Sequence, residues 1–139
     1  MIFFVHVFLL WFPKKQFAVE TRDSLGENNN VSLFGMPEEN DWIFNAPYTD
    51  KSLMRNVLIY NMARGAGSYA SRSHYFELVI NGDYRGVYVM LEKVKRDDNR
   101  VDIDKLNPDE VSGDDLSGGY ILSLIHISEP TRPLYISYA

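Results

Sequence analysis

The stretch YFELVINGDYRGVYVMLEKVK, residues 75–95, decides the fold. Apolar and polar side chains alternate over residues 75–80 and again over residues 87–92, which is the two-residue period of half-buried strands. Between the two runs lies Asn81-Gly82, and both residues tolerate a positive φ. The pattern predicts a β-hairpin, and the distance between the runs predicts a turn longer than the tightest two-residue type.

One more strand and one helix accompany the predicted hairpin. Residues 14–21, KKQFAVET, alternate again between apolar and polar side chains. From Asp50 onward the spacing becomes helical, because apolar residues recur three and four positions apart, at Leu53, Met54, Val57, Leu58 and Met62. Asp50 is a good N-cap residue, and Gly65 ends the pattern. We therefore expect an α+β fold, an antiparallel sheet with a β-hairpin packed on one main helix over residues 51–64.

Length and composition narrow the possible classes of protein. The chain has 139 residues, enough for one domain with a real core, and its 45% hydrophobic and 14% aromatic content argues against disorder. Its net charge of -5 gives no reason to expect nucleic acid as a partner, because phosphate backbones are bound by clustered basic residues. The absence of cysteine excludes disulfides, thiolate metal sites and a thiol nucleophile.

Both ends of the chain stand apart from this pattern. Residues 1–12, MIFFVHVFLLWF, are an apolar run shorter than the roughly 20 residues that span a bilayer as a helix. The run is a targeting segment, a buried strand or a foreign N-terminus, and the first is least favoured because no Lys or Arg precedes it. Residues 123–139 continue no earlier pattern and resemble translated sequencing-adapter sequence. We therefore expect a domain over residues 13–122, followed by a tail without a function of its own.

Three motifs have a structural explanation that we favour over a functional one. Residues 65–70, GAGSYA, spell a phosphate-binding glycine loop, but they follow a predicted helix instead of preceding one, so a helix C-cap and turn explain them. Four acidic residues lack the spacing of a calcium loop and indicate a solvated turn instead of a metal site; they are Asp97, Asp98, Asp102 and Asp104. His74 lacks the partners of a Ser-His-Asp triad. From these three motifs we therefore predict no metal ligand and no catalytic residue.

Lys14 and Lys15 are more informative. They stand at the edge of a predicted strand that is followed by a helix and then by an antiparallel hairpin. This is the order of elements in the N-lobe of a protein kinase, where a strand lysine holds the nucleotide phosphates. The alternative is a pair of solvent-exposed lysines at a strand edge.

Four segments together closely resemble the CotH kinase family, the relatives of spore coat protein H. They are Lys14-Lys15-x-Phe17, residues 41–50 (DWIFNAPYTD), residues 54–56 (MRN) and, above all, residues 81–93 (NGDYRGVYVMLEK). The resemblance implies an atypical protein kinase that transfers the γ-phosphoryl group of ATP to Ser or Thr hydroxyls of a partner protein, using Mg²⁺. It also implies a coat or surface protein, so we expect an extracytoplasmic location in the cell envelope or spore coat.

The resemblance implies roles for particular residues. Lys14 or Lys15 is similar to the phosphate-holding lysine, and the sequence does not decide between them. The hairpin resembles the two strands that lead to the nucleotide hinge, so the backbone groups of Glu92, Lys93 and Val94 are expected to hydrogen-bond adenine. Five further residues belong to the family's pattern, as fold support or as ligand contacts: Asp41, Trp42, Asn45, Asp50 and Arg55.

The chain departs from the family and from ordinary kinases in three respects. Residues 1–12 contain no glycine where the family has a Gly- and Ser-rich segment. Residues 51–64 contain no acid to pair with the strand lysine, so Asp50 or Glu92 would have to substitute, or the pair is absent. Kinases take their metal-binding and base carboxylates from a later lobe, so we expect the fragment itself to be inactive. The rival expectation is a non-catalytic coat or envelope interaction protein that uses tyrosines near the hairpin, namely Tyr69, Tyr75, Tyr84 and Tyr88.

Overall fold

The computed structural model describes residues 2–8, 12–104 and 107. The chain forms two compact units, residues 1–93 and residues 94–139, and each is described by itself. The described elements all belong to the first unit and are β1 (Ile2–Phe8), β2 (Gln16–Arg22), β3 (Asp41–Asn45), α1 (Arg55–Gly65), β4 (Ser73–Ile80) and β5 (Asp83–Glu92). In these ranges, no helix has the length and apolar character needed to cross a membrane. The tail over residues 123–139 lies outside the described residues.

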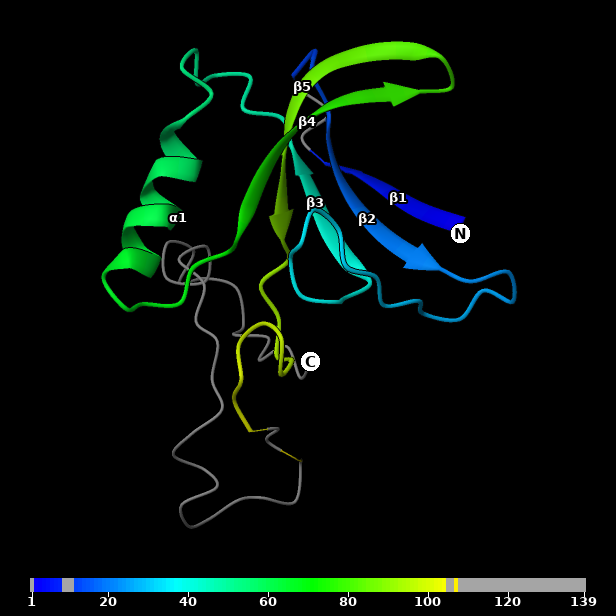
Figure 1. The fold of residues 1–139 in the computed structure, drawn as a ribbon. Coiled ribbons are helices and arrows are strands. Elements are labelled where there is room, and N and C mark those ends of the chain that lie inside the picture. Colours follow the sequence, from blue (N-terminus) through cyan, green and yellow to red (C-terminus); the bar gives the residue numbers. More distant parts are fainter. Residues whose placement is uncertain (1, 9–11, 105–106, 108–139) are drawn as a thin grey trace, which may run out of the picture. The chain divides into compact units, whose positions relative to one another are not determined.

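The strands form one antiparallel five-stranded sheet in the order β1-β2-β3-β5-β4 (Figure 1). This confirms the α+β class, the antiparallel sheet and the hairpin. The sheet also contains β3, which the sequence analysis did not predict as a strand and which lies between β2 and β5. Its register sets Phe44 beside Phe17 of β2 on one side and beside Met90 of β5 on the other.

The core lies on one face of this sheet. Its buried side chains from the strands are Phe17, Val19, Trp42, Leu78, Tyr88 and Met90. The loop between β2 and β3 packs on this face through Met36, which is 5% exposed, and through the partly buried Leu33. Trp42 is fully buried and its indole N–H donates to the carbonyl of Glu39 over 3.1 Å, which ties the loop to the sheet. Burying each such side chain contributes about 1.5–3 kcal/mol.

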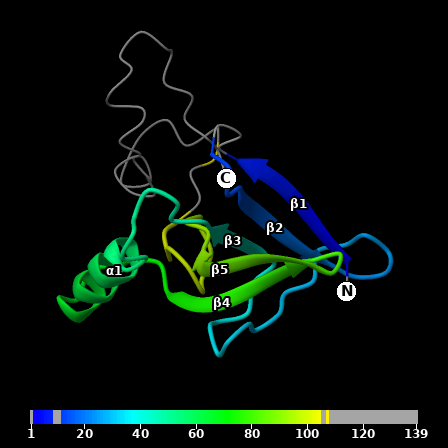
Figure 2. The ribbon, with the colours of Figure 1, turned by 90° about the horizontal axis from the view of Figure 1, so that it is seen from above.

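The expectation that the helix packs on the sheet was wrong. No residue of α1 is buried, and four apolar side chains in or next to it are more than half exposed: Met54, Leu58, Ile59 and Met62. Figure 2 shows α1 beside the sheet instead of flat against its core face. On the core face, Met36 and Leu33 of the β2–β3 loop pack against the sheet instead.

The helix also begins later than expected, at Arg55. Leu53 has a φ of 58°, which no helical residue adopts, and the N-cap position is Met54 without a side-chain hydrogen bond. Asp50 still supports the helix from five residues before its start, because its Oδ2 accepts the backbone N–H of Arg55 over 2.9 Å. The segment after Asp50 is therefore a turn, and the apolar pattern of residues 53 and 54 does not belong to the helix.

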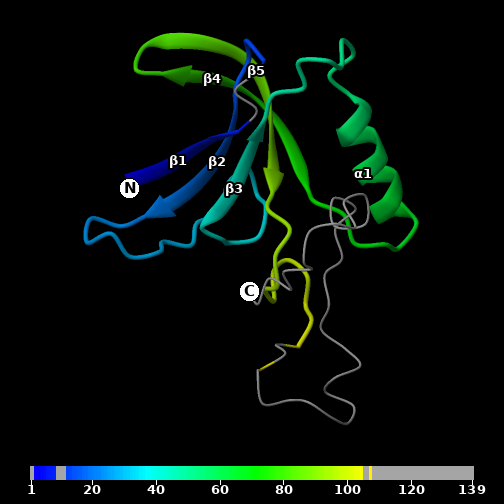
Figure 3. The ribbon, with the colours of Figure 1, turned by 180° about the vertical axis from the view of Figure 1, so that it is seen from behind.

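The hairpin turn is shorter than expected, and an irregularity follows it. Ile80 pairs directly with Asp83, so the turn is the two-residue type, with φ of 52° at Asn81 and 81° at Gly82. Further on, Val79 pairs with Tyr84 and Leu78 pairs with Gly86, which leaves Arg85 as the extra residue of a β-bulge. The outer part of the hairpin is strongly curved (Figure 3), as bulges increase local twist.

The described part of the second unit contains the predicted acidic turn. The backbone N–H of Asp97 donates to the carbonyl of Val101, and Asp98, Asp102 and Asp104 are exposed. Within the described ranges, no three side chains of the types that bind metals gather into one group. The exposure of Asp98, Asp102 and Asp104 agrees with the interpretation of this segment as a solvated turn, and Asp97 is half-buried.

Candidate functional site: a cationic hollow beside Tyr88

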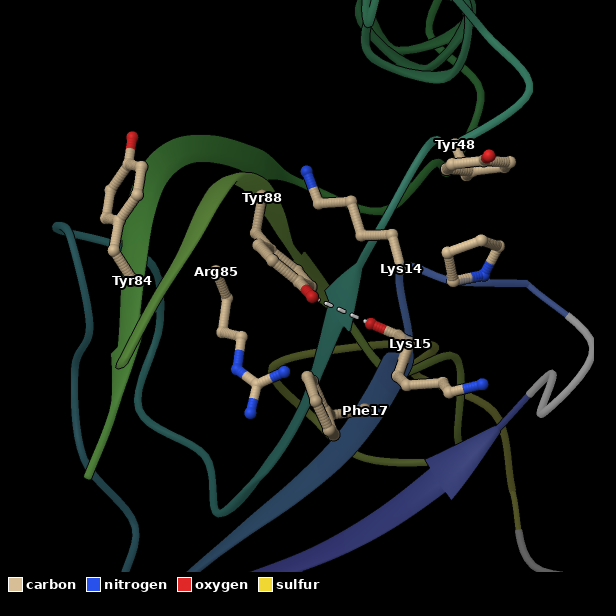
Figure 4. A pocket seen from close by; sticks show the side chains of 8 residues that line it. Lys14, Lys15, Phe17, Tyr48, Tyr84, Arg85 and Tyr88 are labelled. Atoms are coloured by element: carbon tan, nitrogen blue, oxygen red, sulfur yellow. Dashed lines mark hydrogen bonds between the residues drawn. The ribbon is translucent and has the colours of Figure 1, made fainter. Parts of the chain in front are cut away.

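An open hollow of about 310 Å³ lies between the residues that precede β2 and the part of β5 that follows its bulge. Three cations and four aromatic rings line it, namely Lys14, Lys15, Arg85, Phe17, Tyr48, Tyr84 and Tyr88 (Figure 4). We call it the cationic hollow. Both lysines predicted to hold phosphate therefore line one hollow, together with an arginine that the sequence analysis did not single out.

Lys14 lies two residues before β2, and its side chain reaches across to β5. Its ammonium donates a hydrogen bond to the carbonyl of Val87 and lies 4.5 Å from the centroid of the Tyr88 ring. Partial burial lowers the pKa of Lys14, because desolvation disfavours the charged form. Lys14 forms no ion pair in the described part of the chain, so its charge is not neutralised by a carboxylate. An ammonium has three donors, and one carbonyl occupies only one of them.

Lys15 points away from Lys14, as Figure 4 shows. Its ammonium donates to the carbonyl of Phe12 over 2.7 Å, while its own carbonyl accepts the hydroxyl of Tyr88 over 2.9 Å. The two lysines thus attach the entrance of β2 to β5 in different ways, one through its side chain and one through its backbone. Lys14 directs its charge toward Tyr88, and Lys15 directs its charge toward the chain before β2.

Arg85 reaches the hollow because it is the extra residue of the bulge. Gly86, which follows it, has a φ of 87° that favours glycine. Arg85 pairs with Asp83 over 2.9 Å, but both side chains are about half exposed, and such surface pairs contribute only about 0–1 kcal/mol. A glycine inside a strand pattern indicates a bulge, so Gly86 was the sequence signal for Arg85.

Three tyrosines complete the hollow. Tyr88 is 1% exposed, and burial raises the pKa of its phenol. Tyr84 is exposed and donates to Oε1 of Glu77 over 3.0 Å, a hydrogen bond that raises the pKa of Tyr84. Tyr48 is 41% exposed. The raised pKa values keep the phenols of Tyr84 and Tyr88 neutral near pH 7, so the hollow presents aromatic rings beside three cations. This arrangement can bind an anion, and phosphate suits it best because Lys and Arg are its usual ligands.

Glu92 belongs to a different part of β5. Its carboxylate is buried and accepts two hydrogen bonds of 2.8 Å from Arg72, one from the guanidinium and one from the backbone N–H. Its own backbone N–H donates to the carbonyl of Arg72 over 3.3 Å. Because Glu92 is five positions after Val87, it lies about 17 Å further along the strand, and the buried Met90 lies between them. The structure does not bring Glu92 into the cationic hollow.

The other two predicted hinge residues are exposed. Lys93 follows Glu92 and forms an ion pair with Asp41 over 3.0 Å. Val94 begins the second unit, and its side chain is 50% exposed. Neither candidate substitute for a kinase lysine–carboxylate pair reaches Lys14, because Glu92 pairs with Arg72 and Asp50 with Arg55.

The glycine segment over residues 65–70 forms a helix end, as predicted. Gly65 is the last residue of α1, and Gly67 follows with a φ of 83°, so residues 65–70 begin as a helix end and turn. His74 stacks on Phe34 with ring centroids 4.3 Å apart. Among the residues of the family's pattern, Trp42 lies in the core and Asp41 and Asp50 hold neighbouring chain segments through Lys93 and Arg55.

The fold and the hollow define an α+β domain with a cationic, aromatic-lined site suited to phosphate. A family model described as CotH kinase protein matches residues 9–126, most of the chain, and the protein therefore belongs to the CotH kinase family. No curated protein and no solved structure matched the chain.

Proposed function

We propose that the described domain is the nucleotide-phosphate-binding part of a protein kinase of the CotH family. The complete protein would transfer the γ-phosphoryl group of ATP to a Ser or Thr hydroxyl of a protein substrate, in the cell envelope or spore coat. One observation carries this proposal: the unneutralised ammonium of Lys14 lies in a hollow that also holds Lys15 and Arg85. Family membership supplies the reason to identify the bound anion as the phosphates of ATP.

Lys14 is the better candidate of the two lysines for phosphate. Its ammonium is attached to β5 and rests on the Tyr88 ring, so its position is fixed before a ligand arrives. A fixed cation loses little side-chain entropy on binding, and its partial desolvation strengthens its attraction for an anion. Lys15 and Arg85 would add charge from either side of the hollow.

In phosphoryl transfer, the bond from the γ-phosphorus to the bridging oxygen of ATP breaks while a bond to the acceptor hydroxyl oxygen forms. The described residues would contribute binding and orientation of the phosphates. They do not gather carboxylates into a site for Mg²⁺, so we assign no metal ligand and no catalytic base to them. Lys93 and Val94 remain proposed backbone contacts for adenine, whereas the N–H of Glu92 is already bonded to Arg72.

Calorimetric titration with ATP, with and without Mg²⁺, tests the proposal. Lys14→Ala and Arg85→Ala should each weaken ATP binding, and Lys14→Ala should weaken it about 10-fold or more, since a charged hydrogen bond contributes about 1.5–3 kcal/mol. Arg64→Gln removes the same charge at the far end of α1 and should leave the affinity unchanged. Unchanged binding by a folded Lys14→Ala variant would overturn the phosphate assignment.

The rival function, a non-catalytic interaction protein of the coat or envelope, has one supporting observation. Of the four tyrosines expected at such a surface, Tyr69, Tyr75 and Tyr84 are between 41% and 58% exposed, and tyrosine is enriched at protein interfaces. Tyr88 is 1% exposed and does not belong to this surface. Failure of the protein to bind ATP at millimolar concentration would favour this rival.

A further inference from the structure

A second hollow, of about 300 Å³, lies where β3 ends and α1 begins. Its polar lining residues include Gln16, Asn45, Asp50, Arg55 and Asn56. It shares Tyr48 with the cationic hollow but none of the three cations there. We call it the Asn45 hollow.

Asn45 is an unsatisfied group in this hollow. It is the last residue of β3 and is 8% exposed, and its side-chain Nδ2 is buried without a hydrogen-bond partner. An amide nitrogen carries two donors, and leaving such a group unpaired in the interior costs about 1–3 kcal/mol. Groups of this kind are rare in folded proteins and need an explanation. A ligand that accepts hydrogen bonds would provide one.

Further donors line the same hollow. The side chain of Arg55 is 80% exposed, and only its Nε approaches a carboxylate, at 3.5 Å from Oδ1 of Asp50. The two terminal nitrogens of its guanidinium have no partner within the described residues. Arg55 and Asn56 are also the first residues of α1, an 11-residue helix whose N-terminus carries partial positive charge.

Asp50 is the acidic residue of this lining, and both of its carboxylate oxygens already accept hydrogen bonds from neighbouring residues. Its Oδ1 accepts the backbone N–H and the hydroxyl of Ser52, and its Oδ2 accepts the backbone N–H of Arg55. These hydrogen bonds favour the ionised carboxylate, whose charge is offset by Arg55 and the helix N-terminus. The donor left without a partner in the interior is the Nδ2 of Asn45, and the exposed guanidinium of Arg55 lines the same hollow.

We propose that the Asn45 hollow is a second binding site, for an oxyanion, either phosphate or carboxylate, held by the Asn45 amide and the Arg55 guanidinium. This proposal is independent of ATP binding in the cationic hollow, because the two hollows use different donors. The anion can be free, or it can be the end group of a larger ligand whose remainder passes Tyr48.

Nuclear magnetic resonance of the full ¹⁵N-labelled chain provides the test. Inorganic phosphate is added at constant ionic strength, and the side-chain NH₂ signals of Asn45 and the Nε–H signal of Arg55 are followed. Both should shift saturably, whereas sodium chloride alone should shift neither. Sodium acetate in a parallel titration distinguishes carboxylate from phosphate. Signals of Asn45 that do not saturate with either anion would overturn the proposal.

Two variants sharpen this test. Arg55→Gln should weaken phosphate binding at Asn45 by up to about fivefold, as expected for an exposed cation, while Arg64→Gln, the same change at the other end of α1, should not. Asn45→Leu removes the unpaired donor, so it should raise the melting temperature of the free protein and abolish the saturable shift at Arg55. A lowered melting temperature in Asn45→Leu together with unchanged anion binding would contradict the assignment of Asn45.

A third variant separates this inference from the proposed function. Lys14→Ala should leave the phosphate titration at Asn45 unchanged even if it abolishes ATP binding. If Lys14→Ala instead removes the shift at Asn45, the phosphate binds in the cationic hollow and the second site does not exist.

Discussion

The ammonium of Lys14 donates a hydrogen bond to the carbonyl of Val87, 73 residues further along the chain, and rests over the ring of Tyr88. This contact fixes the entrance of β2 against the middle of β5, although β3 separates the two strands in the sheet. The result is a lysine whose position is set by the fold, with a bulge beside it that brings Arg85 to the same hollow.

Gly86 should be needed for both the bulge and the site. Its φ of 87° makes Gly86→Ala strained, by about 1–2 kcal/mol, and the new Cβ would lie 3.7 Å from the Lys14 ammonium. Thermal unfolding should show the destabilisation, and ATP titration should show weaker binding. Gly67→Ala, with a similar φ of 83° outside both hollows, should be destabilised but bind ATP normally. Equal ATP affinities of the two variants would contradict the role of the bulge.

The β2–β3 loop, and not the helix, should stabilise the core. Met36→Ala removes a side chain that is 5% exposed, so it should reduce the free energy of unfolding by about 2–5 kcal/mol. Met62→Ala, in α1 at 60% exposure, should change it by less than about 0.5 kcal/mol. Denaturant unfolding measures both values. A larger loss in the helix variant would show that α1 packs against the core after all.

The Arg72–Glu92 pair should act on stability and not on nucleotide binding. Arg72→Ala leaves the carboxylate of Glu92 buried without its guanidinium partner, which should destabilise the protein by about 3 kcal/mol. Chemical denaturation tests the stability, and calorimetry should find an unchanged affinity for ATP at a temperature where the variant is folded. Lost affinity in the folded variant would instead place this pair in the nucleotide site.

Asp50 should make the protein sensitive to acid. Hydrogen bonds from Ser52 and Arg55 hold the pKa of Asp50 below its ordinary value of 3.8. The stabilisation that the Asp50 carboxylate gives the folded protein is therefore complete above a pH of about 3.8, and it is lost as the pH falls through the lower pKa of Asp50 in the folded state. Melting temperatures of the wild type should approach those of Asp50→Asn as the pH decreases in this range. A constant difference down to strongly acidic pH would contradict the shift.

The local turn chemistry was readable from the sequence, but the packing of elements far apart in the chain was not. Asn81-Gly82 predicted the hairpin because these two residues adopt positive φ easily, as both do here. The five residues of β3 were too few for their alternation to be recognised. The helix was expected to pack on the sheet because nothing in the sequence showed that Leu33 and Met36 would occupy that face from a loop.

The candidate site was predicted in part. Strand order and family pattern pointed to Lys14 and Lys15, and both line the cationic hollow. Their different directions follow from contacts with Val87 and Phe12, which the sequence does not reveal. Arg85 was missed because a bulge shifts the alternation by one residue.

The most direct measurement follows the lysines themselves during ATP binding. In protein labelled with ¹³C at lysine Cε, the signal of Lys14 should shift saturably as ATP is added, with the dissociation constant found by calorimetry. The signal of Lys51 should move less, because Lys51 does not line the cationic hollow and contacts only the ring of Tyr48 at its edge. A saturable shift at other lysines with no change at Lys14 would contradict the claim that Lys14 holds the phosphates.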